Sequence, residues 1–130
     1  DPSEPSFVYD PETRYCTISK DGMYSVWGYV VVAGLAPIVG PGTELNNPWF
    51  TVALVADGGP YFSAGMMEGY LAKNQVSFLP PGGVTLGCEL FLYATFLPAG
   101  FRFMMECELS NPGTSNWVVT ERCLMVSRVA

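Results

Sequence analysis

The sequence contains no histidine. Without an imidazole, the chain has no Ser–His or Cys–His nucleophilic pair, no imidazole acid or base for catalysis near neutral pH, and no histidine-ligated metal. Charged residues are also scarce, since they make up 14% of the chain against about 25% in an average soluble domain. Disordered chains are rich in charge and poor in apolar residues, so disorder is excluded as well. We therefore expect a folded protein that is not an enzyme and that holds no cofactor and no metal ion.

Basic residues are scarcer than acidic residues. Lys and Arg number 6 against 12 Asp and Glu, which gives a formal net charge of −6. Nucleic-acid phosphates and anionic lipid headgroups both require a basic surface, so we expect neither as a partner. A long apolar run is missing too, because residues 23–39 are interrupted by Ser25, Gly28, Gly34 and Pro37. A membrane-spanning helix needs about 20 consecutive apolar residues, so no membrane insertion is expected.

Apolar side chains, in contrast, are in excess for a chain of this size. The 130 residues fit one domain, yet 49% of them are hydrophobic and 14% aromatic. A domain of roughly 150 residues buries only about 70% of the surface that its unfolded chain exposes. We therefore expect part of this apolar surface to lie in a subunit interface. Residues 1–6 are typical of the end of a linker or stalk, and residues 7–130 are expected to form a single head domain.

The four cysteines leave their own oxidation state open. None has the C-x-x-C spacing of a metal or redox site, and each lies in an apolar, strand-like run. Buried free thiols agree with this pattern. At least one disulfide agrees with it too, with three possible connectivities if all four cysteines pair. The redox compartment is therefore not decided by Cys16, Cys88, Cys107 and Cys123.

Alternating apolar and polar residues predict β-strands rather than helices. Residues 84–96 carry Val, Leu, Cys, Leu, Leu, Ala and Phe at the even positions, and we expect this side to face the core. Residues 101–109 alternate in the same way, and the Pro- and Gly-containing segment 97–100 lies between the two runs. The pattern predicts that the two runs form an antiparallel hairpin.

Four further segments are expected to be strands. Residues 23–32 are apolar at both odd and even positions, which predicts a strand whose two faces are both covered, the second by another subunit. Residues 49–56 predict another strand, and residues 117–120 and 122–129 predict two short ones.

The connections 40–47, 59–74 and 110–116 are expected to be loops, and loops of this length are usually functional or loosely ordered. Many short strands separated by 14 Gly and 11 Pro are typical of an all-β antiparallel sandwich of jelly-roll type.

Residues 9–28 carry a more specific pattern, with an aromatic residue, a turn and then Gly-x-Tyr-x-aliphatic. The segment resembles the first strands of the complement globular-head family, which belongs to the tumour-necrosis-factor-like jelly-roll superfamily. Residues 97–101 resemble the family's turn before its penultimate strand, and residues 124–129 resemble its final strand. In this alignment Asp21 and Gly22 are expected to form a left-handed turn. The positions that match in the first segment are Tyr15, Gly22, Tyr24 and Val26.

The chain also departs from the family. Residues 120–124 read Thr-Glu-Arg-Cys-Leu where the family usually ends in Phe-x-Gly-Phe-Leu, and the Asp/Asn-rich segment that binds calcium in some members has no match. The resemblance implies a compact homotrimer whose aromatic and aliphatic residues pack around a threefold axis. We assign Trp27, Tyr29 and Tyr93 to this interface, with packing under loops in a monomer as the alternative.

Aromatic residues at the junctions of loops and strands are candidates for receptor contact, because Trp and Tyr dominate binding hot spots and stack on sugar rings. Ordinary packing at the edge of the core is the alternative for each of them. Glu106 and Glu108 lie two apart on a strand, so we expect a solvated face and not a catalytic carboxylate pair. The candidate binding residues are Trp49, Tyr61, Phe62, Asn116 and Trp117.

Two function classes fit these observations best. The first is a trimeric receptor-binding head of a viral or phage fibre, extracellular or on the virion surface, that attaches to a host surface protein or glycan. The alternative is a secreted complement-type head that acts as a signalling or pattern-recognition ligand, and a structural capsid or spore-coat module is a third class. The chain has no N-x-Ser/Thr glycosylation sequon, which favours the fibre. A collagen repeat upstream would favour the secreted head, and a coiled-coil or β-repeat shaft would favour the fibre.

Overall fold

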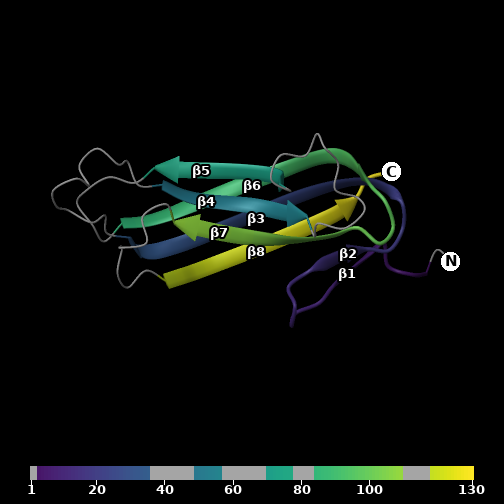
Figure 1. Cartoon of the computed structure of the whole chain (residues 1–130), viewed down its shortest axis with the longest axis horizontal. Helices are drawn as coiled ribbons and strands as arrows, with labels where there is room; N and C mark the ends of the chain where they lie inside the picture. Colours follow the sequence, from purple (N-terminus) through teal and green to yellow (C-terminus); the bar gives the residue numbers. More distant parts are fainter. Residues whose placement is uncertain (1–2, 36–48, 57–69, 78–83, 110–117) are drawn as a thin grey trace.

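The computed structural model describes residues 3–35, 49–56, 70–77, 84–109 and 118–130 (Figure 1). Within these residues the chain forms eight strands and no helix, so the all-β prediction is confirmed. The strands are β1 (Phe7–Tyr9), β2 (Cys16–Ile18), β3 (Gly22–Leu35), β4 (Trp49–Ala56), β5 (Tyr70–Ser77), β6 (Val84–Leu97), β7 (Arg102–Leu109) and β8 (Val118–Arg128).

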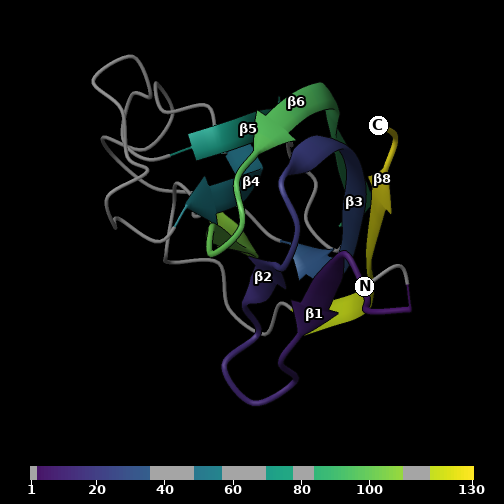
Figure 2. The same cartoon turned by 90° about the vertical axis from the view of Figure 1, so that its right-hand side faces the viewer.

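The strands form two antiparallel sheets of unequal width. One sheet has five strands in the order β1-β2-β7-β4-β5, and the other has three in the order β6-β3-β8. Figure 2, which looks along the strands, shows β3 and β8 on one side of the molecule and β2, β4 and β7 on the other. The predicted antiparallel β-sandwich is therefore confirmed.

The strand pairings are nested in the sequence. β4 pairs with β5, β3 with β6, and β2 with β7, so the middle of the chain is folded back on itself as one long hairpin that is wrapped into two sheets. The last strand in the sequence, β8, pairs with β3, and the first strand, β1, pairs with β2.

The predicted hairpin of residues 84–96 with 101–109 is wrong. β6 belongs to the three-stranded sheet and β7 to the five-stranded sheet, so the two strands do not pair with each other. Alternation could not distinguish the two arrangements, because each strand buries one face in either case. The connection instead binds the end of β2: the N–H of Gly100, whose φ is 91°, donates to the carbonyl of Ile18, and the N–H of Ile18 donates to the carbonyl of Phe101.

The core lies between the inner faces of the two sheets. Its members are the alternate apolar residues of the strands, and they pack without a buried side-chain polar atom left unpaired among the described residues. The largest fully buried side chains are Tyr24, Phe50, Phe103, Ile18, Leu54, Val26, Val32, Val52 and Cys16.

A β-bulge in β6 changes which residues of that strand face the core. Tyr93 and Ala94 together lie opposite Ser25, and the N–H of Ala94, whose φ is 39°, donates to Ser25 Oγ at 3.0 Å. One extra residue reverses the alternation beyond it. The even positions face the core only as far as Leu92, and Phe96 is therefore exposed while Leu97 is buried.

Two predicted boundaries also change. Strand β5 covers residues 70–77, part of which was expected to be loop, because its exposed centre of Lys73, Asn74 and Gln75 hides the alternation. The two predicted strands 117–120 and 122–129 are one strand, β8, whose register against β3 shifts between Val31 and Val32.

Gly22 does not form the predicted left-handed turn, because it is already the first residue of β3 and its φ is not positive. A glycine is needed there for space, since a Cβ would lie 2.7 Å from the carbonyl oxygen of Ala130. The C-terminus is held at this point by the N–H of Met23, which donates to Ala130 O at 2.9 Å.

Tyr24 ties the N-terminal segment to the core. Its ring is fully buried, and its hydroxyl lies 2.7 Å from the carbonyl oxygen of Lys20 and 3.0 Å from that of Ser6.

We expect Tyr24→Phe to lower the free energy of unfolding by about 1–2 kcal/mol, because the carbonyls lose their donor. Urea denaturation measures this. Tyr9→Phe, which removes a hydroxyl from an exposed ring of β1, is the control, and equal losses in the two variants would contradict this role of Tyr24.

Candidate functional site

The outer face of the three-stranded sheet carries a continuous group of large apolar side chains. Residues directly opposite each other on neighbouring strands project from the same face. Trp27 of β3 lies opposite Phe91 of β6 and Met125 of β8, and Met23 lies opposite Phe96. We call this surface the aromatic face and define it by Trp27, Tyr29, Phe91, Tyr93, Phe96 and Met125.

The rings of the aromatic face are ordered by contacts with one another. The Trp27 ring centroid lies 5.1 Å from that of Tyr29 and 6.4 Å from that of Phe91. Phe91 and Tyr93 are stacked at 5.5 Å with an interplanar angle of 5°. Trp27 Nε1 donates to the Glu89 carboxylate at 3.0 Å, so the polar atom of the indole already has its partner. The rings of the aromatic face are therefore held in place by one another, and the indole N–H of Trp27 needs no further partner.

Four of these side chains are far more exposed than the apolar residues of the buried core. Tyr93 is 73% exposed, Met125 56%, Phe96 55% and Phe91 46%. Scattered apolar residues are normal on a protein surface, but a contiguous group of this kind marks an interaction site. The aromatic face is therefore our candidate functional site.

The three residues assigned from the sequence to a subunit interface, Trp27, Tyr29 and Tyr93, all lie on the aromatic face. Their role in an interface stays a prediction. Sequence reasoning missed Phe91 and Met125 and placed Phe96 in the core. The signal that identifies them is the register between strands, which the sequence pattern does not contain.

The predicted receptor-contact residues fall largely outside the described part of the chain. Tyr61, Phe62, Asn116 and Trp117 all lie outside the described residues, and for Trp49 the structure describes only the backbone, which begins β4 opposite Ser77. Their role stays a prediction.

The carboxylates of β7 lie on the surface of the five-stranded sheet. Glu106 and Glu108 are both exposed, as expected for a solvated face. Among the described residues, no three side chains of the metal-binding types gather closely enough to hold an ion. The described residues also include no helix with the length and apolar character to cross a bilayer.

All four cysteines are free thiols, so the structure contains the first of the two alternatives left open by the sequence. Cys16 and Cys88 are buried, and Cys107 and Cys123 are half-buried. Burial raises the pKa of the Cys16 thiol to about 11, and it raises the pKa values of Cys88 and Cys107 as well. Raised pKa values disfavour the reactive thiolate, so these three cysteines are unsuited to nucleophilic chemistry.

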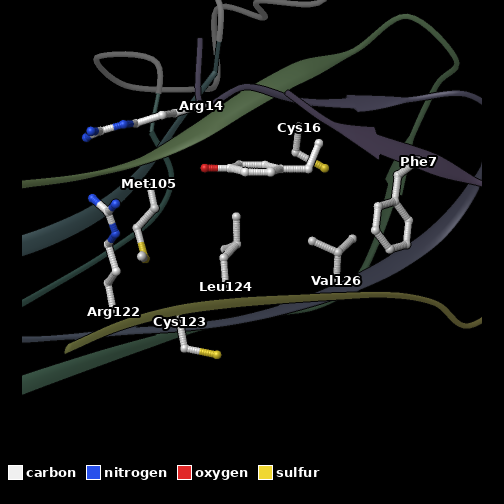
Figure 3. A pocket seen from close by; sticks show the side chains of 9 residues that line it. Phe7, Arg14, Cys16, Met105, Arg122, Cys123, Leu124 and Val126 are labelled. Carbon is white, nitrogen blue, oxygen red and sulfur yellow. The ribbon is translucent and has the colours of Figure 1, made fainter. Parts of the chain in front are cut away.

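A cleft of about 300 Å³ opens between the two sheets, on the side where β1 and β2 face β8 (Figure 3). The guanidinium groups of Arg14 and Arg122 lie together at one end of the view, and Phe7 and Val126 lie at the other. The thiol of Cys123 points away from the cleft, toward the outer face of the sheet. The lining residues are Phe7, Tyr9, Arg14, Cys16, Met105, Arg122, Cys123, Leu124 and Val126.

A scan against models of known protein families finds no match for this chain, and a search among curated proteins finds no relative.

The raised pKa of Cys16 predicts how stability depends on pH. The folded state keeps the proton of this thiol up to about pH 11, whereas the unfolded chain releases it near pH 9. The contribution of Cys16 is therefore fully present below pH 9 and is lost as the pH rises toward 11. We expect this loss to be about 1–3 kcal/mol.

Urea denaturation under reducing conditions at pH 8 and pH 10.5 measures this change. The Cys16→Ala variant is the control, because it retains every other titrating group. A fall of equal size in the wild type and in the variant would show that Cys16 does not contribute.

Proposed function

We propose that this chain is a trimeric receptor-binding head domain of a viral or phage fibre that attaches to a host surface protein or glycan. Three copies associate through the aromatic face, and the domain acts outside the cell or on the virion surface without catalysing a reaction. The observation that carries the proposal is the aromatic face itself, which leaves ordered rings exposed on a folded domain.

The proposed topology of the head is a jelly roll. In that architecture the chain folds into a long hairpin and is then wrapped into two sheets, as two Greek keys. The nested pairs β4–β5, β3–β6 and β2–β7 and their distribution over two sheets support this topology. The resemblance of residues 9–28 to the complement globular heads points to the same superfamily.

The free energy of removing apolar surface from water supports association through the aromatic face. Only 14% of the residues are charged, and the apolar area of this face gains free energy when it leaves water. β3 crosses the middle of the face, so a neighbouring copy placed there covers the second apolar side of that strand. A trimer would cover the face on every copy, whereas a monomer would leave it in water.

The geometry of the sandwich also gives the head an outer end. Figure 1 shows both termini at one end of the molecule. The ends of β3 and β7 and the starts of β4 and β8 lie at the opposite end (Figure 1). A stalk joined to the N-terminus would therefore present that opposite end to a host.

We assign the first receptor contact to Trp49, which begins β4, and to Asn116 and Trp117, which precede β8 in the sequence. Tyr61 and Phe62 lie between Ala56 and Tyr70, two strand residues at the end of the sandwich that also carries the termini. The proposal therefore does not require all five predicted residues to share one contact.

The alternative function is a secreted complement-type head that acts as a signalling or pattern-recognition ligand. The match at Gly22 and Tyr24 favours it, whereas the missing glycosylation sequon favours the fibre. Both functions use a trimer, so they differ in the segment upstream and in the surface that is recognised.

The proposal predicts that loss of the aromatic face abolishes both assembly and attachment. We expect Phe91→Ser/Tyr93→Ser to sediment as a folded monomer and to bind glycan arrays or host cells at least tenfold more weakly than the trimer, because multivalent contact is lost. Val8→Ser changes a similarly exposed apolar residue on the other sheet and should leave both properties unchanged.

Each part of the proposal has its own contradicting result. If the double variant remained trimeric, the result would contradict the assignment of the aromatic face to the subunit interface. A trimeric wild type that binds neither cells nor glycans would contradict attachment while leaving assembly intact.

A further inference from the structure

The cleft between the sheets results from their unequal width. Five strands face three, so the inner face of β1 and β2 extends past the edge of the three-stranded sheet. The series β4–β5, β3–β6 and β2–β7 would continue with a pair formed by β1 and β8. Instead, β1 pairs with β2 in one sheet and β8 pairs with β3 in the other. The space between β1 and β8 is therefore left without a strand and forms the cleft.

The interior of the cleft is apolar. Phe7, Met105, Leu124 and Val126 pack against the buried core but are themselves only partly buried. Gly28 of β3 lets the opposing sheet come close here, since a Cβ at this position would lie 2.7 Å from Met105 Sδ. The core is thus continuous with the cleft, and an apolar group that enters it would complete the cover of these side chains.

One end of the cleft carries two arginines, although the protein has a net charge of −6. Arg14 comes from the turn between β1 and β2, and Arg122 comes from β8, and both line the cleft. Within the described residues, neither guanidinium group makes an ion pair or a hydrogen bond. Glu106 and Glu108 line an adjoining hollow that shares both arginines, and they too form no ion pair with them. Among the described residues, nothing therefore competes with an anion for these two guanidinium groups.

The backbone at Arg14 is a second, independent observation. Its φ is 67°, in the left-handed region that a residue with a long side chain rarely adopts. The turn holds this conformation through the N–H of Arg14, which donates to Asp10 O at 2.7 Å, and the N–H of Asp10, which donates to Tyr15 O at 2.9 Å. Strained residues of this kind concentrate at functional sites, and here the strained residue lines the cleft.

From these observations we propose that the cleft binds a small amphiphile with one carboxylate group, such as a medium-chain fatty acid. The apolar chain lies against Phe7, Leu124 and Val126, and the carboxylate accepts hydrogen bonds from Arg14 and Arg122. A cavity of about 150 Å³ in another protein holds benzene, so a cleft of this volume holds roughly a dozen non-hydrogen atoms. Decanoate has that size. The site lies between the sheets, apart from the aromatic face and from the proposed receptor contacts.

Methyl NMR titration of the intact protein with sodium decanoate, below its micelle concentration, tests the proposal. We expect saturable binding that shifts the methyl signals of Leu124, Val126 and Met105, while the signals of Val52 and Leu54, deep in the core, stay in place. 1-Decanol and decyltrimethylammonium should bind at least fivefold more weakly, because they offer no anion to the arginines. This comparison needs no variant.

Variants then test the two arginines. Arg14→Gln and Arg122→Gln should each weaken decanoate binding about five- to tenfold, whereas Lys73→Gln on β5 removes an equal charge at the far edge of the five-stranded sheet and should leave it unchanged. Circular dichroism confirms that each variant is folded.

Three results would overturn the proposal. In the first, decanol binds as tightly as decanoate. In the second, the shifted signals belong to the aromatic face. In the third, decanoate has no effect and the methyl signals of Leu124 and Val126 change with protein concentration, which would mean that a second copy of the chain covers the cleft.

Discussion

Strand β3 is apolar on both faces, and the rest of the structure is arranged around that constraint. Its inner side chains, among them Tyr24 and Val26, are buried between the two sheets. Its outer side chains, led by Trp27, lie on a face that has no second layer among the described residues. A two-layer sandwich can cover only one side of a sheet. Because removing apolar area from water is the main driving force of both folding and association, the outer side of β3 favours a partner surface.

The unequal width of the two sheets leaves apolar side chains partly exposed at a second place, the cleft between β1, β2 and β8. The aromatic face is an outer surface and the cleft is a gap between layers, so they suit different occupants. A face with stacked rings suits another folded chain, whereas a largely apolar cleft with Arg14 and Arg122 at one end suits a small amphiphilic anion. In both places apolar side chains of the strands are incompletely buried.

The sequence was sufficient for the strands with strong alternation and insufficient for their arrangement. It predicted β4 and β7 and the two-faced character of β3, because these follow from local periodicity. It failed for the partner of β6, which is β3 and not β7, since a strand that buries one face shows the same alternation whichever strand it pairs with. It also failed for Phe96, because the bulge at Ala94 reverses the alternation, and for β5, whose exposed polar centre hides its pattern. For the candidate site, the sequence found Trp27, Tyr29 and Tyr93, but the register that places them with Phe91 and Met125 is a long-range property.

The central claim is that the aromatic face is covered by copies of the same chain. Light scattering of the unaltered protein at two concentrations tenfold apart tests it most directly, because native mass does not depend on shape. The account predicts a mass near three times 14.1 kDa at both concentrations. A mass of 14.1 kDa at both would leave the outer side of β3 in water and would contradict the account.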